Sequence, residues 1–345
     1  MIEDAKGDIN LSSTALIVLQ KGSENYLLKT LKEARKCAAE AKRIKITPKD
    51  IKLARRIQGA HSSQPIKIAH YVFEAAGGSD NKKAPVIFLH GLLNSKEVWD
   101  TIPQRVAELT KRKVFTYDAR NHGESEHTRN SSFNNNLQDL YSFMDRMDIQ
   151  DSILVGHNLG GLTTISAALQ EPKKVKKAFI VEMHLNKIQQ ELVDRSFTIM
   201  ETWTNEIRRV PKDTHDDDIT RISVSLMYEN LPEEMKLQSE KETYQKSKFI
   251  YKRKPDGSFR NMLYTEAISE SLKLYEKSPI IHNGKYEGAA FFLYGSNSLL
   301  NVGYEEANIK KHFPLAEMIE FENASHYLFV DFPDKFVDTL VQRMK

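Results

Sequence analysis

The segment 153–161, ILVGHNLGG, has the composition of a buried strand that runs into a tight turn and then a helix. In the pattern G-x-S-x-G, the glycines permit a sharp, strained turn, and the serine at its apex serves as a nucleophile. This chain carries Asn158 at the apex, between Gly156 and Gly160. A carboxamide nitrogen is not nucleophilic, because its lone pair is delocalised into the carbonyl group. The sequence therefore predicts the scaffold of a nucleophilic catalyst without its nucleophile.

Three further polar loops follow predicted strands. They read HGLL from His90, DARNHGES from Asp118 and NASHY from Asn323. The glycine after His90 lets the chain turn sharply, so that a backbone N–H can point into a site. In parallel sheets, ligands bind beyond the carboxyl ends of the strands. We therefore expect these loops and the turn at Asn158 to meet in one place.

Short apolar runs alternate with helical patterns in the second, larger part of the chain, which predicts a parallel sheet covered by helices on both faces. The expected helices are Asn94–Thr110, Phe133–Met147 and Leu159–Gln170. The expected strands are Ile66–Phe73, Pro85–His90, Lys113–Asp118, Ser152–Gly156, Lys177–Met183, Ala289–Tyr294 and Glu317–Phe321.

Residues 66–345 resemble the α/β-hydrolase superfamily, and within it the esterases of the abhydrolase-domain-containing group. The resemblance is carried by VIFLHGL, DARNHGES, VGHNLGG and NASHYLFVDFP, and it spans nearly all of this region. It implies an α/β fold, an α/β-hydrolase sheet with a helical cap, the cap lying at about residues 185–285. It also implies hydrolysis of carboxylic esters or thioesters and a small acyl-ester-like ligand, with no cofactor.

The resemblance assigns roles to several residues. In the family, the elbow serine attacks the acyl carbonyl, a late histidine takes its proton, and two backbone N–H groups bind the oxyanion. His326 matches the histidine, Asn158 replaces the serine, and the oxyanion groups are the N–H groups of Leu92 and Leu159. Loss of one triad member leaves roughly 10³–10⁴-fold catalysis over water. We therefore expect lost or strongly impaired catalysis, the alternative being a misread serine codon at position 158.

Two carboxylates are candidates for the acid that orients His326. Many hydrolases keep an aspartate after the strand that ends at Tyr294 here, but this chain has GSNS at residues 295–298. Glu182 stands at the end of the strand after the elbow helix, where relatives in the family place an aspartate. Glu266, in the cap, is the second candidate. The hydroxyl groups of Thr163 and Ser125 are not at the apex of the turn and offer no replacement nucleophile.

The first 65 residues differ in charge from the rest, with 13 Lys and Arg against 7 Asp and Glu. Residues 8–59 resemble the carboxy-terminal half of core histone H-three, most specifically in the run ITPKDIKLARRIQG. The chain is therefore divided into an incomplete, all-α histone-fold-like segment (1–60), a linker (61–65) and the hydrolase domain (66–345). In the histone family the first helix packs across the long central one, so without it we expect dimerisation with histone H-four to be weak.

The histone-like segment gives a second functional hypothesis, a chromatin-associated module. Lys42, Arg43, Lys45 and Lys49 match the basic end that lies near DNA in the histone family, and such a cluster predicts salt-sensitive, sequence-independent DNA binding. A third hypothesis is an artefactual fusion of two genes. The histidines have no zinc-binding spacing, and no apolar run is long enough to span a membrane. The expected location is intracellular: the nucleus if the histone-like segment acts, otherwise the cytoplasm or the mitochondrion.

Overall fold

The computed structural model describes residues 66–129, 131–236, 241, 245, 251–277, 280 and 282–345. The predicted histone-like segment, the linker at 61–65 and the four basic residues Lys42, Arg43, Lys45 and Lys49 lie outside the described residues.

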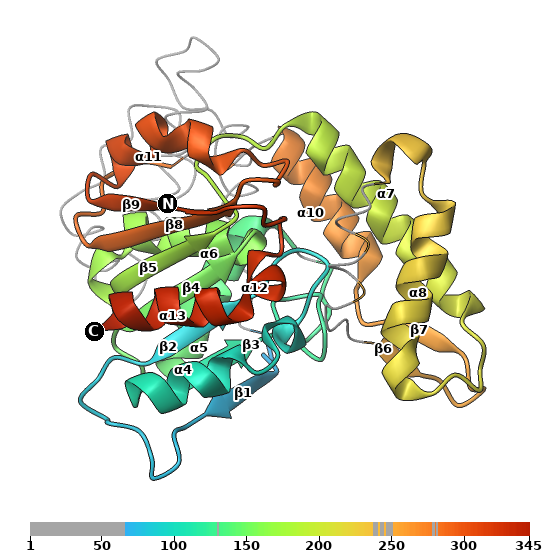
Figure 1. The fold of residues 1–345 in the computed structure, drawn as a ribbon, viewed down its shortest axis with the longest axis horizontal. Helices are drawn as coiled ribbons and strands as arrows, with labels where there is room; N and C mark the ends of the chain where they lie inside the picture. Colours follow the sequence, from blue (N-terminus) through green and yellow to red (C-terminus); the bar gives the residue numbers. More distant parts are fainter. Residues whose placement is uncertain are drawn as a thin grey trace, which may run out of the picture. The chain divides into compact units, whose positions relative to one another are not determined.

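A seven-stranded sheet forms the centre of the described part, in the order β1-β3-β2-β4-β5-β8-β9 (Figure 1). Neighbouring strands from β3 to β9 pair in parallel, whereas β1 pairs antiparallel with β3 at the edge. The strands are β1 (His70–Phe73), β2 (Val86–Leu89), β3 (Val114–Tyr117), β4 (Ser152–His157), β5 (Val175–Val181), β8 (Ala289–Gly295) and β9 (Ala316–Phe321).

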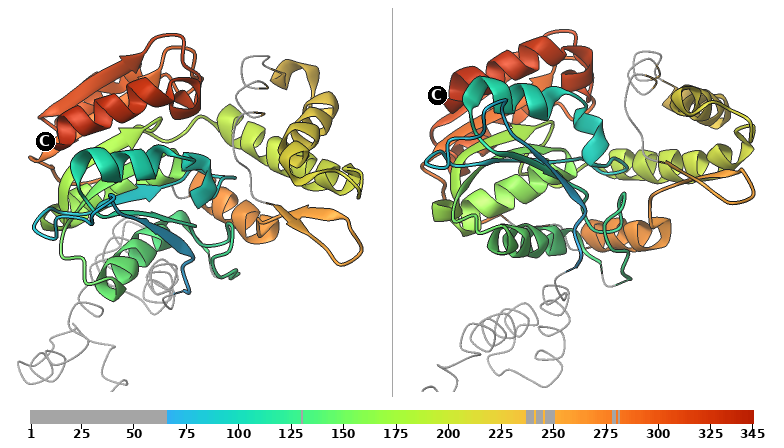
Figure 2. Two further views of the ribbon diagram at one scale, coloured as in Figure 1. Left: turned by 60° about the horizontal axis from the view of Figure 1, so that its bottom comes forward. Right: turned by 90° about the horizontal axis from the view of Figure 1, so that it is seen from below.

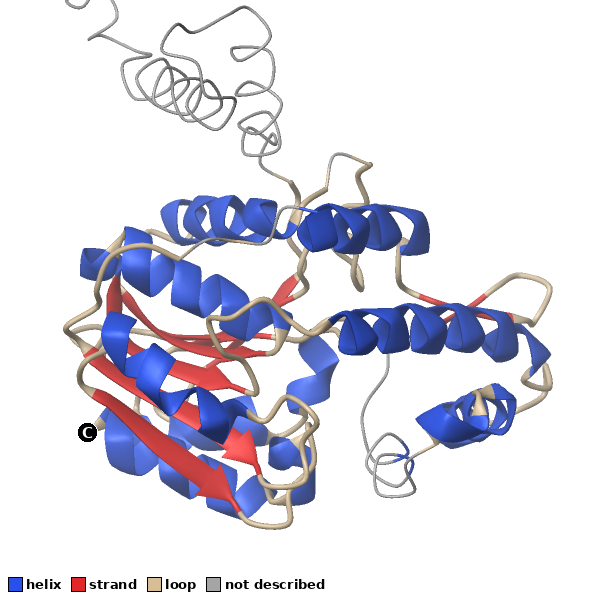
Figure 3. Cartoon of the chain, turned by 90° about the horizontal axis from the view of Figure 1, so that it is seen from above, coloured by secondary structure: helices blue, strands red, loops and turns tan. Residues whose placement is uncertain are grey.

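Helices cover both faces of this sheet, as the apolar strands require. In β2, Val86 and Phe88 pack into one hydrophobic core, and Ile87 and Leu89 pack into the other. Figure 3 shows the helical layers on either side of the strands. The first core includes residues of α4 (Ile102–Thr110) and α13 (Pro333–Met344), and the second includes residues of α5 (Phe133–Arg146), α6 (Leu159–Gln170) and α11 (Glu306–His312). The predicted α/β fold, a sheet with helices on both faces, is therefore confirmed.

Two predicted elements differ from the structure at their ends. The predicted strand Ile66–Phe73 joins the sheet only from His70, because Lys67 and Ala69 form their backbone hydrogen bonds with the loop that follows β3. The expectation that the whole sheet is parallel is wrong for this same edge strand, which runs antiparallel.

The predicted helix Asn94–Thr110 is two helices. A 3₁₀ turn, η1 (Lys96–Trp99), ends at Asp100, whose φ of 46° is outside the helical region, and α4 begins at Ile102. Pro103 explains the break, because it has no N–H to donate to the carbonyl group four residues earlier. Apolar periodicity alone did not reveal this interruption.

The chain between β5 and β8 forms the cap (Figures 1 and 2). It holds α7 (Gln190–Glu206), α8 (Asp216–Asn230) and α10 (Thr265–Lys277), with its own hydrophobic core around Met200, Trp203 and Phe259. The cap is not purely helical, since β6 (Tyr251–Arg253) and β7 (Phe259–Asn261) form an antiparallel hairpin.

Short 3₁₀ turns occur inside and outside the cap, at η2 (Pro172–Lys174), η3 (Ile207–Arg209), η4 (Glu233–Met235) and η5 (Val302–Glu305). Helix α12 (Leu328–Asp331) precedes α13.

Helix α6 lies unusually close to the strands that it covers. A Cβ atom on Gly160 would lie 2.1 Å from the carbonyl oxygen of Leu89, and one on Gly156 would lie 2.2 Å from the carbonyl oxygen of Gly160. Only glycine fits at both positions, so β2, β4 and the start of α6 are fixed relative to one another. Within the part of the chain that the structure describes, no helix is long and apolar enough to cross a bilayer.

Candidate active site

The turn between β4 and α6 presents Asn158 at its apex. Strand β4 ends at His157, α6 begins at Leu159, and Asn158 has φ 50° and ψ −111°. A positive φ is unusual for a residue with a side chain, although asparagine adopts it more readily than most residues. Because β2 pairs with β4, the loop after β2 lies beside this turn. That loop approaches closely at Gly91, where a Cβ atom would lie 2.7 Å from His157 Nδ1.

The side chain of Asn158 lies against the two backbone N–H groups that the resemblance assigns to oxyanion binding. Its Oδ1 accepts hydrogen bonds from the backbone N–H of Leu159, at 2.9 Å, and of Leu92, at 3.4 Å. Both partners are donors, so the atom facing them must be the carboxamide oxygen and not the nitrogen. The two N–H groups that the resemblance named as an oxyanion hole therefore do converge, and the oxygen that they hold belongs to the protein itself.

Glu182 and His326 form a buried pair at the same end of the sheet. Glu182 follows β5 with a φ of 52° and is fully buried, and its Oε2 lies 3.0 Å from His326 Nδ1. The other carboxylate oxygen accepts the N–H of Gly295 at 2.6 Å, and the hydroxyl group of Ser298 donates to Oε2. With Nδ1–H donated to the carboxylate, the lone pair of the imidazole is on Nε2.

The loop at 295–298, which lacks the aspartate common in hydrolases, holds the carboxylate instead of supplying it. Its Gly295 N–H and Ser298 hydroxyl group both bind Glu182. Sequence reasoning missed Ser298, although the absence of an acid in this loop was the available signal. The other acid candidate, Glu266, is an exposed residue in the first turn of α10, where the hydroxyl group of Thr265 donates to its carboxylate. The structure therefore brings Glu182, and not Glu266, to His326.

A cavity of about 150 Å³ separates the end of the sheet from the cap, and both Asn158 and His326 line it. A second cavity of about 80 Å³ also has Leu92, Asn158 and His326 in its wall. Most of the wall of the larger of these two cavities is apolar. The cap contributes Ile188, Leu192, Ile199, Leu272 and Tyr275 to it. Such a wall suits the hydrocarbon part of a ligand, with the polar groups at one end.

The hydroxyl groups near this site are committed to other hydrogen bonds. Ser125 donates to the carbonyl oxygen of Asp118, and Thr163 donates to that of Leu159. Ser196, which lines both cavities, donates to the carbonyl oxygen of Leu192 within its own helix. Among the described residues, His, Cys, Asp and Glu side chains form no group of three or more that could hold a metal ion.

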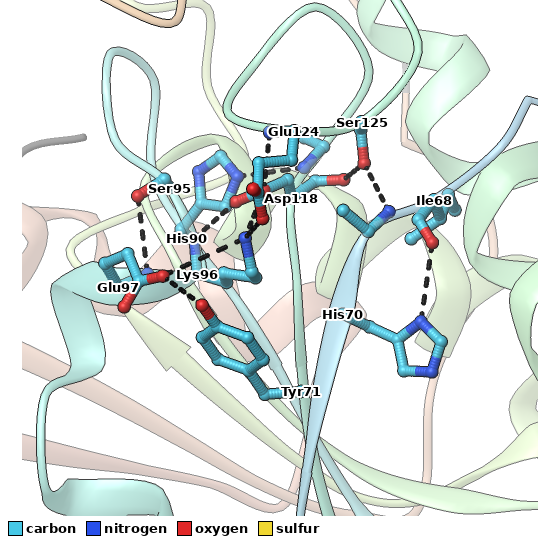
Figure 4. Close-up of polar contacts among 12 residues, drawn as sticks. Ile68, His70, Tyr71, His90, Ser95, Lys96, Glu97, Asp118, Glu124 and Ser125 are labelled. Carbon is cyan, nitrogen blue, oxygen red and sulfur yellow. Dashed lines mark hydrogen bonds and ion pairs between the residues drawn. The ribbon is translucent and has the colours of Figure 1, made fainter. Parts of the chain in front are cut away.

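A buried ion cluster fixes the loop that carries Leu92 (Figure 4). Lys96 is 2% exposed, and its Nζ lies 2.8 Å from Asp118 Oδ2 and 2.8 Å from Glu124 Oε2. The backbone N–H of Lys96 also donates to Asp118 Oδ1 at 2.7 Å. The motif DARNHGES, noted in the sequence as a loop that could carry chemistry, thus anchors the neighbouring loop. Sequence reasoning did not single out Lys96.

Three buried histidines, His90, His122 and His157, have lowered pKa values. His90 Nδ1 donates to the Gly91 carbonyl oxygen, its Nε2 accepts the N–H of Ala119 at 2.9 Å, and burial lowers its pKa to about 4. Burial likewise lowers the pKa of His122 to about 3, and its Nδ1 lies 2.8 Å from the Arg120 carbonyl oxygen. His157, whose ring lies 4.6 Å from that of His326, has its pKa lowered by burial and by His326.

The sequence is similar to that of known families and proteins. Residues 84–333 match the family model described as alpha/beta hydrolase fold, and residues 1–57 match that of the core histone domain. The sn-1-specific diacylglycerol lipase ABHD11 of Danio rerio is 27% identical over 283 residues, covering 81% of this chain and 83% of that protein. Ethanol acetyltransferase 1 of Hanseniaspora uvarum is 23% identical over 290 residues, covering 76% and 79%.

Solved structures share the same architecture. A marine microorganism esterase superposes with a TM-score of 0.62 at 20% identity, covering 80% of this chain and 99% of that chain. A thioesterase domain from the curacin biosynthetic pathway superposes with a TM-score of 0.52 at 18% identity, covering 81% and 95%.

The Lys96 cluster yields a stability prediction. Lys96→Met leaves the buried Asp118 carboxylate without its cation, and breaking such a buried pair costs about 3–5 kcal/mol. Urea unfolding should show a loss of that size. Lys113→Met, which removes an exposed pair with Glu74, should cost less than about 1 kcal/mol. Equal losses in the two variants would show that the buried cluster does not hold the loop.

The buried histidines yield a pH prediction. Their pKa values lie below the value of about 6.5 for an unfolded histidine, so below pH 6.5 the unfolded chain binds more protons than the folded chain. The free energy of unfolding should therefore fall as the pH drops from 6.5 towards 4, by about 1.4 kcal/mol per pH unit for each such histidine. His122→Asn keeps a donor for Arg120 but cannot titrate, so urea unfolding between pH 5 and 6.5 should show a shallower slope. An unchanged slope would contradict the assignment.

Proposed function

Because this chain belongs to the α/β-hydrolase fold family, we propose that it is a carboxylic ester or thioester hydrolase scaffold whose catalysis is lost or strongly impaired at Asn158. The observation that carries the proposal is the pair of hydrogen bonds from Leu92 and Leu159 to Asn158 Oδ1. The contact of Glu182 with His326 and the apolar cavity that both Asn158 and His326 line also support the proposal.

Asn158 impairs catalysis in two separate ways. It supplies no hydroxyl group for His326 to deprotonate, so the covalent route is closed. It also fills the oxyanion hole, so a substrate carbonyl must displace a side-chain oxygen before the N–H groups can stabilise a transition state. One oxyanion donor is worth roughly 10²–10³ in rate, and the catalysis left after loss of a triad member comes largely from that hole. The protein should therefore be even less active than a simple nucleophile knockout.

In this proposal the remaining side chains keep the roles that the family resemblance gives them. Glu182 orients His326 through Nδ1 and is itself held by the hydrogen bonds from Gly295 and Ser298. The natural occupant is a small acyl-ester-like molecule, whose hydrocarbon part packs against the cap helices. One relative is named a diacylglycerol lipase and another an ethanol acetyltransferase. Both names describe reactions of acyl esters, which supports this class of ligand.

Restoring the hydroxyl group tests the proposal. The wild-type protein should show negligible hydrolysis of p-nitrophenyl esters, and Asn158→Ser should restore turnover, because it supplies a nucleophile and empties the oxyanion hole. Initial rates of p-nitrophenol release measure both. Rapid hydrolysis by the wild-type protein, or a covalent acyl-enzyme trapped on it with a fluorophosphonate probe, would contradict the loss of catalysis.

The same variant separates the two acid candidates. In the Asn158→Ser background, Glu182→Gln should lower kcat by roughly 10⁴-fold, as loss of the orienting acid does in serine proteases. Glu266→Gln removes an equally charged but exposed carboxylate and should leave kcat within about twofold. A large loss with Glu266→Gln and none with Glu182→Gln would reverse the assignment.

A second function, DNA binding by the histone-like segment, is favoured by the core-histone match at residues 1–57 and by the excess of basic residues there. Replacing Lys42, Arg43, Lys45 and Lys49 with alanine should weaken duplex-DNA binding uniformly across sequences. The slope of log K against log salt should become shallower by about 0.9 for each lost phosphate contact, so by up to about 4. Fluorescence anisotropy with labelled duplexes at several salt concentrations measures this slope.

The matched control removes the same number of charges from the hydrolase domain. It uses exposed lysines and replaces Lys173, Lys212, Lys252 and Lys310 with alanine. This control should leave the salt slope unchanged. If the full-length protein does not bind DNA at low salt and does not pull down histone H-four, this second function is wrong.

A further inference from the structure

The carboxamide of Asn158 is held in the way that this fold holds the carbonyl group of a substrate. Its oxygen lies between the Leu92 and Leu159 N–H groups, which polarise the C=O bond and would stabilise negative charge on that oxygen. A primary amide is itself a hydrolysable acyl group, and its carbon atom Cγ is the electrophile. The Asn158 side chain is therefore itself an acyl group that is bound in this site.

A base and space for water adjoin the same carbonyl group. His326 lines both cavities that Asn158 lines, of about 150 Å³ and about 80 Å³. A water molecule needs only roughly 10–15 Å³ together with polar partners, and the side chains of Asn158 and His326 offer such partners. The hydrogen bond from Nδ1 to Glu182 leaves Nε2 of His326 as the proton acceptor.

We propose that Asn158 is a self-modification site, at which the Glu182–His326 pair hydrolyses the side-chain amide to a carboxylate. In this reaction His326 Nε2 takes a proton from water as the water oxygen bonds to Cγ. The Leu92 and Leu159 N–H groups hold the resulting oxyanion, the C–N bond breaks, and His326 returns its proton to the leaving nitrogen. One water and one carboxamide give one carboxylate and one ammonium ion, so residue 158 becomes aspartate.

The product suits the site better than the starting amide does. A carboxylate at this position keeps both backbone hydrogen bonds, which are stronger to a charged acceptor. It also caps the N-terminus of α6, a helix of 12 residues whose dipole favours a negative charge there. General-base catalysis contributes roughly 10²–10⁴-fold and one oxyanion donor roughly 10²–10³-fold, and the fixed position of the amide removes the need to bind a substrate.

This inference rests on the proposed function, because it uses the same base and the same oxyanion hole. A different route to aspartate starts with attack of the Leu159 backbone nitrogen on Cγ. That route passes through a cyclic imide, does not need His326, and yields isoaspartate together with aspartate. The two routes therefore differ in their products and in their dependence on His326.

The experiment follows residue 158 in the purified full-length protein by peptide mass spectrometry during incubation in ¹⁸O-water. The label marks aspartate that forms in the tube and separates it from aspartate already present after expression. In the wild-type protein we expect aspartate at position 158 without isoaspartate, and a rate of conversion at least 100-fold lower in His326→Ala and in Glu182→Gln. Glu266→Gln should convert at the wild-type rate.

An internal reference is present in the same digest. Asn283 is exposed and precedes Gly284, the neighbour that most favours the cyclic imide route, so it should convert at one rate in every variant. Asn158 that stays intact while Asn283 converts would overturn the inference. Conversion of residue 158 at the wild-type rate in His326→Ala or in Glu182→Gln, or formation of isoaspartate at this position, would also overturn it.

Ester hydrolysis by Asn158→Ser in the same assay series distinguishes the two proposals. If that variant is active while Asn158 of the wild-type protein never converts, the self-modification fails and the proposed function stands. If the variant is inactive and Asn158 never converts, the shared base and oxyanion hole are wrong, and both proposals fail together.

Discussion

Two backbone N–H groups that converge on one oxygen atom are the constraint on which the rest of this site depends. They belong to Leu92 and Leu159, which are far apart in sequence and meet because β2 and β4 are neighbours in the sheet. A buried donor without an acceptor costs about 1–3 kcal/mol. The Asn158 carboxamide supplies the acceptor, so its side chain satisfies both N–H groups.

The backbone conformation of Asn158, at the apex of the turn between β4 and α6, depends on the packing around it. Asn158 adopts a sparsely populated backbone conformation, which costs of order 1–3 kcal/mol and persists only where the surroundings fix it. The contact of Gly160 with Leu89 fixes the elbow from below, and the Lys96–Asp118 pair fixes the loop that carries Leu92. In this scaffold the N–H groups of Leu92 and Leu159 can polarise a carbonyl group, whether it belongs to a ligand or to residue 158.

The sequence predicted most of the sheet but not where its elements are interrupted. Leu159–Gln170 forms a helix over the whole predicted range, because its long apolar run directly after the turn at Asn158 is a local signal. The helix predicted from Asn94 breaks at Asp100, and the first strand pairs only from His70. The two errors have different causes: Pro103 has no N–H to continue the first helix, and hydrogen bonds from Lys67 and Ala69 to the loop after β3 delay the strand.

By itself, the sequence determined the fold class, the elbow with its missing hydroxyl group, and the histidine that follows the last strand, because each of these is written in a short run of adjacent residues. Only the tertiary structure decided which glutamate lies against His326, since Glu182 follows β5 and Glu266 lies in the cap helix α10, and the sequence left both as candidates. It also decided that the Ser298 hydroxyl group binds that carboxylate and that Lys96 lies buried against Asp118. These contacts join residues from different strands and loops, and burial and distance between such residues exist only once the sheet has formed.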